Sequence, residues 1–237
     1  MANKTLVKAF SILLVILMAG SAIMMLANGA LGGGGSSNVK VKPVEAPEGG
    51  IVMDTGSRLF PNIPVPAVGP ADARLQIYIF YSMFCPFCAN EILNNLDYYL
   101  QLTSEGIARV YFVDFPQQGA QELHAVLRCL AKNDGPFLEA MTSLYRILAE
   151  DKTLPTMDDM KKFLEERGIT LDQACIEEEL QDVARIASIS YRTYDIRGTP
   201  TIVVYDTVSD KAYMVVGEQK RENLVQFIND VLEGRAG

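Results

Sequence analysis

The stretch that most constrains this chain is Cys85-Pro86-Phe87-Cys88, which lies between a strand pattern and a helix pattern. The seven residues Leu75–Tyr81 before it are rich in β-branched and aromatic side chains, as is typical of a buried strand. After it, apolar residues recur at helical spacing: Ala89, Ile92, Leu93, Leu96 and Leu100. The sequence therefore predicts that a strand turns into a helix at the two cysteines.

A position at the start of a helix changes the chemistry of a cysteine. Pro86 suits the first helical position, because its missing N–H would have no partner there. The free N–H groups and the positive end of the helix dipole favour the thiolate of Cys85. Cys88 lies about one turn further along, close enough to form a readily exchanged disulfide. The pattern indicates redox exchange, with Cys85 as nucleophile and Cys88 as resolving thiol.

Two other interpretations of the cysteine pair are an inert structural pair and a zinc site. A structural pair would not need a helix N-terminus. Structural zinc takes four ligands, typically from two such pairs, whereas this chain has a single Cys-x-x-Cys and one histidine. We therefore expect no metal and no bound cofactor.

The length of the chain allows a folded domain, and its charge argues against binding to nucleic acid. The 237 residues suffice for a hydrophobic core, and the net charge is −8. No basic stripe is present that could neutralise phosphates, so nucleic acid is not an expected partner.

The N-terminus carries a targeting pattern. Lys4 and Lys8 precede Ala9–Ala27, nineteen residues without a charge. As a helix, this segment would be roughly 28 Å long, which is about the thickness of a bilayer core. The flanking lysines would keep the N-terminus inside and place the rest of the chain outside the cytoplasm. We expect residues 1–31 to be a membrane anchor. A cleaved signal peptide, whose apolar region is usually about 7–15 residues, is the alternative.

The next part of the chain has a linker composition. Glycine, serine and proline dominate residues 32–70, with a short strand expected at Ile51–Met53. The folded domain is expected to cover residues 71–234.

Within that domain the patterns alternate between strand and helix. A second strand is predicted at Ile107–Val113, parallel to the first because a helix connects them. Helical patterns fill residues 117–194 and predict a helical subdomain. Strands at Thr201–Tyr205 and Ala212–Val216 then form a hairpin, and a last helix carries Leu224, Phe227, Ile228, Val231 and Leu232.

This order of elements resembles the thioredoxin superfamily, with Gly198-Thr199-Pro200 preceding the final ββα unit. More narrowly, it resembles the DsbA-like thiol:disulfide oxidoreductases of prokaryotic cell envelopes. Val113-Asp-Phe-Pro116 and Arg128-Cys-Leu-Ala131 fit that family's junction and first insertion helix. The resemblance implies an α/β thioredoxin fold (βαβ…ββα) with a helical insertion, here preceded by an N-terminal transmembrane helix.

The resemblance also implies a substrate site. Pro200 would be cis and lie against the active-site disulfide, leaving the Thr199 backbone free to pair with a substrate strand. Phe87, in the spacer, would face the substrate. The implied activity is disulfide exchange on reduced or unfolded proteins outside the cytoplasm, with a membrane redox partner.

Two departures from the family leave the direction of electron flow open. The acid that the family often has six residues before the first cysteine is replaced by Ile79, so the proton acceptor for Cys88 is unidentified. The spacer also lacks the histidine of strongly oxidising members. A disulfide-forming oxidase is the leading prediction. The alternatives are a reductase or isomerase, and a binding module whose cysteines do not turn over.

The remaining two cysteines, Cys129 and Cys175, lie in two insertion helices. They could be buried free thiols. The extracytoplasmic placement favours a structural disulfide, which would close a loop of about 46 residues and contribute ~4 kcal/mol. His124, far from the motif in sequence, is interpreted as structural.

Overall fold

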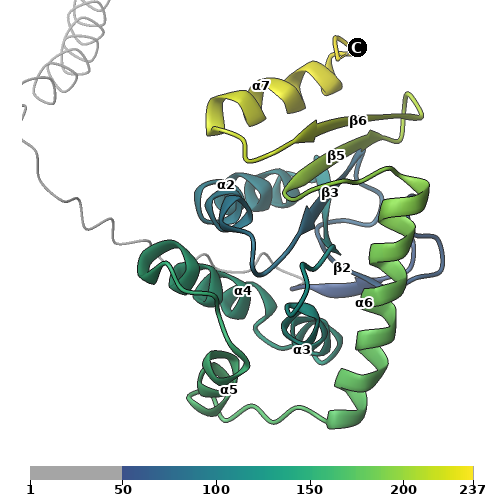
Figure 1. The fold of residues 1–237 in the computed structure, drawn as a ribbon. Coiled ribbons are helices and arrows are strands. Elements are labelled where there is room, and N and C mark those ends of the chain that lie inside the picture. The colour runs from purple at the N-terminus through teal and green to yellow at the C-terminus, as the bar shows by residue number, and fades with distance from the viewer. Residues whose placement is uncertain (1–49, 237) are drawn as a thin grey trace, which may run out of the picture. The chain divides into compact units, whose positions relative to one another are not determined.

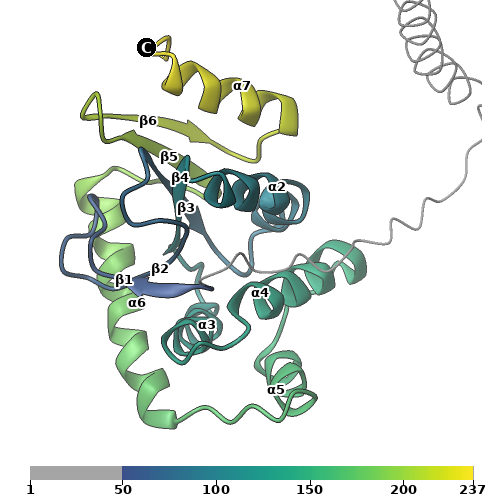
Figure 2. The same ribbon diagram turned by 180° about the vertical axis from the view of Figure 1, so that it is seen from behind.

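The computed structural model describes residues 50–236, which contain a mixed six-stranded sheet of order β1-β2-β4-β3-β5-β6 (Figures 1 and 2). The strands are β1 (Val52–Asp54), β2 (Val65–Val68), β3 (Leu75–Tyr81), β4 (Ala108–Asp114), β5 (Thr201–Asp206) and β6 (Lys211–Val216). The pair β3 and β4 is parallel and the other pairs are antiparallel.

Helices connect and cover these strands. They are α2 (Pro86–Ser104), α3 (Gln121–Lys132), α4 (Phe137–Arg146), the π-helical turn η1 (Ile147–Asp151), α5 (Met157–Glu165), α6 (Gln173–Thr193) and α7 (Arg221–Leu232). The crossover helix α2 joins β3 to β4, which is why these two strands are parallel. The helices from α3 to α6 are inserted between β4 and β5.

Both faces of β3 are buried, and its side chains alternate between two cores. Ile77 and Ile79 pack with α2 and α7, whereas Tyr78 and Phe80 pack with Ile186 of α6 on the other face. Figure 1 shows α2 and α6 on opposite sides of the sheet. A strand that is covered on both faces is expected to be apolar along most of its length, and in β3 only Gln76 interrupts the apolar and aromatic residues.

The predicted fold class is confirmed: an α/β thioredoxin-like fold in which a helical insertion separates a βαβ unit from a ββα unit. The predicted anchor, residues 1–31, lies outside the described residues. Between residues 50 and 236, no helix combines the length and hydrophobicity that crossing a membrane requires.

The interpretation of residues 32–70 as a linker is wrong for its C-terminal part, because β1 and β2 belong to the sheet. The strand β2 pairs with β4 through Ala67 and Tyr111. Asp54 at the end of β1 accepts hydrogen bonds from Arg109 and from the Tyr111 hydroxyl, both at 2.7 Å. These contacts attach the segment to β4, so the sheet begins well before residue 71.

Candidate active site

The first turn of α2 holds both cysteines of the motif. Cys85 is the N-cap residue, with extended backbone angles, and Pro86 opens the helix. The Cys88 backbone N–H donates to Cys85 Sγ at 3.2 Å, so the sulfur takes the place of the oxygen of an ordinary capping side chain. Both thiols are free, and Cys85 is only 2% exposed. The sulfur of Cys85 is thus held at a helix start.

The loop before β5 approaches Cys85 from a distant part of the chain. The Thr199–Pro200 peptide bond is cis. Cys85 Sγ lies 3.2 Å from the Thr199 carbonyl oxygen. Phe87, in the spacer, is 57% exposed. The structure therefore brings Cys85 and Cys88 together with Thr199 and leaves Phe87 accessible beside them.

The environment makes the two thiols chemically different. The hydrogen bond from the Cys88 thiol, supported by the backbone N–H groups of Cys88 and Phe87, lowers the pKa of Cys85 to about 6, although burial opposes this. Burial, followed by the neighbouring Cys85 sulfur, raises the pKa of Cys88 well above its ordinary value. At neutral pH Cys85 is a thiolate and Cys88 keeps its proton, as a nucleophile and a resolving thiol require.

Two side chains of the helical insertion hold the loop between β3 and α2. The Tyr145 hydroxyl donates to the Ser82 carbonyl at 3.1 Å. His124 Nε2 accepts the Met83 N–H at 3.1 Å, across 41 residues of sequence. His124 is far from the motif in sequence, but the fold brings its imidazole to the loop that precedes Cys85. No local pattern could have indicated the contact, because the insertion helices pack behind the site only in the folded chain.

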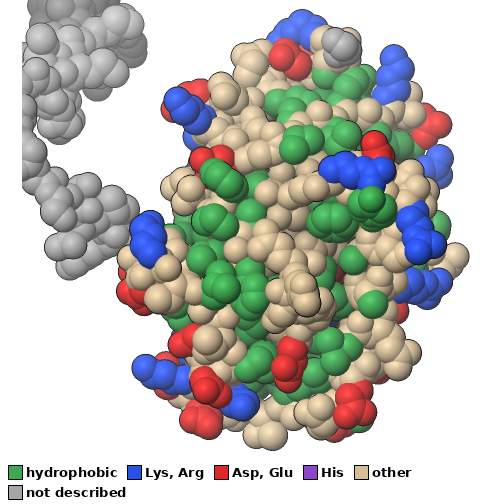
Figure 3. Space-filling model, in the orientation of Figure 1, with side chains coloured by type: hydrophobic (Ala, Val, Ile, Leu, Met, Phe, Trp, Pro, Cys, Tyr) green, Lys and Arg blue, Asp and Glu red, His purple; other side chains and the backbone are tan. Residues whose placement is uncertain are grey.

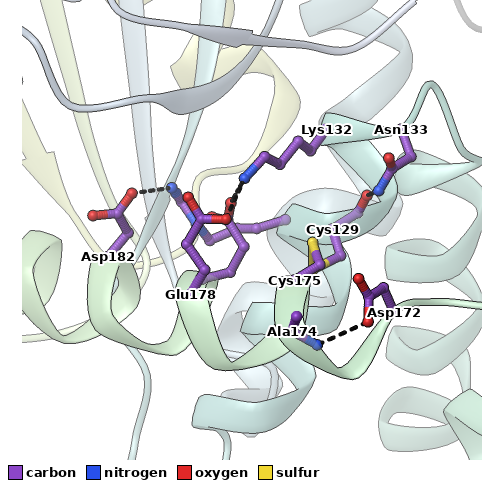
Figure 4. The surroundings of a disulfide bond; sticks show 10 residues. Cys129, Lys132, Asn133, Asp172, Ala174, Cys175, Glu178 and Asp182 are labelled. Atoms are coloured by element: carbon purple, nitrogen blue, oxygen red, sulfur yellow. Dashed lines mark hydrogen bonds and ion pairs between the residues drawn. A yellow bond between two sulfur atoms is a disulfide. The ribbon is translucent and has the colours of Figure 1, made fainter.

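The second pair of cysteines lies away from the motif. Cys129 of α3 and Cys175 of α6 form a disulfide across 46 residues, with their Cα atoms 6.1 Å apart (Figure 4). Beside it, Lys132 contacts Glu178 at 2.7 Å, which also links α3 to α6. The disulfide, rather than two free thiols, is what the structure contains. Among residues 50–236, no group of three or more His, Cys, Asp or Glu side chains is placed to hold a metal ion.

A strand–helix–strand unit with paired cysteines at the helix start, facing a cis-proline loop before a ββα unit, defines a thioredoxin-fold protein. The chain belongs to the thioredoxin family, because the family model described as thioredoxin matches residues 62–230. No curated protein sequence matched the chain.

Solved structures are similar in fold. The α-DsbA1 of Wolbachia pipientis has a TM-score of 0.60 and 13% identity over 71% of this chain and 91% of its own. A periplasmic thioredoxin-like protein from Salmonella enterica serovar Typhimurium has a TM-score of 0.54 and 19% identity over 71% and 90%. A thioredoxin-like oxidoreductase from Silicibacter pomeroyi DSS-3 has a TM-score of 0.54 and 16% identity over 73% and 94%. The predicted resemblance to DsbA-like members of the thioredoxin superfamily is confirmed.

Proposed function

We propose that this protein is an extracytoplasmic protein thiol:disulfide oxidoreductase that forms disulfides in reduced proteins. The observation that carries the proposal is the position of Cys85. Its sulfur caps a helix, accepts the Cys88 N–H at 3.2 Å and lies 3.2 Å from the Thr199 carbonyl. The helix start and the Cys88 N–H stabilise the Cys85 thiolate, which makes it a good leaving group and favours the reduced form of the pair.

The chemistry begins from the oxidised Cys85–Cys88 pair. A substrate thiolate attacks Cys85 Sγ, the Cys85–Cys88 bond breaks, and Cys88 leaves as a sulfur that takes up a proton. A second substrate thiolate then attacks the substrate sulfur of the mixed disulfide and releases the Cys85 thiolate. The substrate loses two electrons, which the cysteine pair gains. A membrane redox partner that accepts these two electrons would restore the disulfide.

The proposed substrates are unfolded or reduced proteins. Phe87 offers an exposed aromatic surface beside Cys85, and the Thr199–Pro200 loop offers backbone groups to an extended chain. In the space-filling view, hydrophobic side chains gather in the middle of the visible face and charged ones lie mostly around its margin (Figure 3). Apolar contact surrounded by charge suits segments that are exposed only before a substrate folds.

The proposed location is the outer side of a cell membrane. Residues 1–31 would anchor the chain there, or would be cleaved as a signal and leave it secreted. The Cys129–Cys175 disulfide supports an oxidising compartment. One protein of similar fold is described as periplasmic.

The test is the reduction potential of the Cys85–Cys88 couple in the full-length protein, equilibrated against glutathione and quantified by alkylation and peptide mass. A value near about −120 mV would support the oxidase, whereas a value near about −270 mV would replace it with a reductase. Cys85→Ser is the control and should abolish exchange. If the wild-type pair does not exchange at all, the non-catalytic binding module becomes the better description.

A further inference from the structure

The loop that delivers Cys85 to α2 is held by a buried side chain outside the cysteine motif. Met83 is buried, and its backbone N–H donates to His124 Nε2 at 3.1 Å. Within the same loop, the Cys85 N–H donates to the Ser82 carbonyl at 3.1 Å and closes a turn. The position of Met83 therefore determines where Cys85 enters the helix.

The hydrogen bond to Met83 determines the tautomer of His124. Because the Met83 N–H donates to Nε2, this nitrogen carries no proton. Nδ1 must then be the protonated nitrogen, and it donates to Asp114 Oδ1 at 2.8 Å. The imidazole is fully buried and stacks on the Tyr81 ring, with 4.6 Å between the ring centroids. It is therefore neutral and fixed in orientation on three sides.

Asp114, at the end of β4, is held ionised although it is fully buried. Burial alone would raise the pKa of Asp114, but hydrogen bonds from His124 and Arg128 hold it below its usual value. Arg128 Nη1 lies 3.0 Å from Asp114 Oδ2, and Arg128 Nε lies 2.7 Å from Glu179 of α6. The acceptor at Nε2 is thus the end of a chain of hydrogen bonds that begins in α6.

This series of buried hydrogen bonds is more extensive than side-chain packing alone requires. Buried ion pairs often stabilise a protein less than apolar side chains of similar volume would, because each charge loses its hydration. In the described part of the chain, no buried side-chain nitrogen or oxygen lacks a partner, so the polar groups are fully matched. A matched network that ends two residues before the nucleophile is suited to fixing geometry.

We propose that His124 is a positioning residue for Cys85. Its neutral imidazole, oriented by Asp114, holds the Met83 N–H and so fixes the loop from which Cys85 enters α2. The proposal rests on the proposed function only in that Cys85 is the nucleophile. Without the contact to Met83, the loop relaxes and the Cys85 sulfur loses its alignment with the Cys88 N–H that stabilises the thiolate.

Two substitutions separate the two contacts of the imidazole. In His124→Asn the side chain can still donate to Asp114 but is too short to reach Met83. In His124→Gln the side-chain oxygen can reach the Met83 N–H in place of Nε2. Tyr99→Phe is the control, because it removes another buried hydrogen bond, from Tyr99 to Glu91, at a distance from the loop.

The readout is the pKa of Cys85 in the reduced protein, measured from thiolate absorbance and from the pH dependence of alkylation. Neither measurement requires turnover of a protein substrate, so the result stands even if the oxidase proposal fails. In His124→Asn, we expect the pKa of Cys85 to rise by about one unit, with alkylation about tenfold slower at pH 5. His124→Gln should restore most of the difference, and Tyr99→Phe should leave the pKa unchanged. Equal pKa values in all four proteins would overturn the proposal and leave His124 a structural residue.

A measurement on the wild-type protein keeps the proposal testable if a variant does not fold. His124 is the only histidine of the chain, so its imidazole signals need no assignment by mutation. A two-bond ¹H–¹⁵N spectrum of the reduced protein should show a proton on Nδ1 and none on Nε2. A proton on Nε2 would exclude the hydrogen bond to Met83 and with it the proposal.

Discussion

The low pKa of Cys85 makes a quantitative prediction about how the reduction potential of the Cys85–Cys88 pair depends on pH. Reducing the disulfide takes up two electrons, and below the pKa of Cys85, about 6, it also takes up two protons. Above that pH, Cys85 stays a thiolate and only Cys88 binds a proton, since its pKa is raised by burial. The potential should therefore fall with pH by about 59 mV per unit below pH 6 and by about 30 mV per unit above it.

The same shift predicts the stability of the reduced protein. The folded state lowers the pKa of Cys85 from 9.0 to about 6, so folding favours the thiolate. The stabilisation is present at high pH and is lost as the pH falls through about 6. Between pH 7.5 and pH 5 the reduced form should lose about 2 kcal/mol relative to the oxidised form, which has no titrating thiol at this position.

Both quantities can be measured on one preparation. The protein is equilibrated with glutathione between pH 5 and pH 8, approached from the oxidised and from the reduced side, and the Cys85–Cys88 peptide is quantified by mass after alkylation. Urea unfolding of the two redox forms at pH 5 and pH 7.5 provides the stability difference. A single slope of about 59 mV per pH unit over the whole range would mean that Cys85 titrates as an ordinary thiol, and the electrostatic account of the site would be wrong.

Three further predictions concern single features. Cys88→Ala should raise the pKa of Cys85, because it removes the thiol whose hydrogen bond is the largest cause of the lowered pKa. Cys88→Ser keeps an O–H donor and should raise the pKa of Cys85 less. Thiolate absorbance measured against pH distinguishes the two variants. Replacing Cys129 and Cys175 together by alanine should destabilise the protein by ~4 kcal/mol in urea unfolding, and an unchanged midpoint would show that the disulfide adds nothing. Phe87→Ser should change the free energy of unfolding by less than about 0.5 kcal/mol, because the ring is exposed. It should nevertheless slow disulfide exchange with a reduced protein more than exchange with glutathione. Equal slowing of both reactions would contradict a role of Phe87 in substrate contact.

The parts of the fold that local patterns determine were predictable from the sequence. The apolar run of β3 and the helical spacing after Cys88 required only neighbouring residues, and the helix begins at Pro86 as the pattern indicated. The cis bond before Pro200 came instead from the family resemblance, because no local pattern specifies that it lies against Cys85.

The parts that depend on long-range pairing were not predictable. The strand β2 has four residues, one of them Pro66, which is too short for a periodic pattern. It exists because Ala67 pairs with Tyr111 of β4. The contact of His124 with Met83 is of the same kind, since the imidazole gains its role from a loop 41 residues away. Short strands and buried polar contacts are decided by tertiary packing, which a single sequence does not display.

The same buried surroundings bear on the direction of the proposed reaction. Ile79, at the position where the family often has an acid, is fully buried and cannot accept a proton. The neighbouring hydroxyls of Tyr81 and Tyr145 donate to Asp114 and to the Ser82 carbonyl, and burial raises the pKa of both tyrosines well above the ordinary value. None of these groups can take the proton from Cys88.

A slow loss of that proton affects the two directions differently. A reductase needs Cys88 to attack the mixed disulfide, because that step releases the reduced substrate. An oxidase does not, because a second substrate thiolate completes the reaction, and attack by Cys88 only returns the substrate unchanged. The raised pKa of Cys88 therefore slows the productive path of a reductase and the unproductive path of an oxidase, but it also makes Cys88 a poorer leaving group when a substrate thiolate opens the Cys85–Cys88 disulfide. The disulfide-forming direction that we propose therefore rests on the stabilised Cys85 thiolate, which favours the reduced form of the pair.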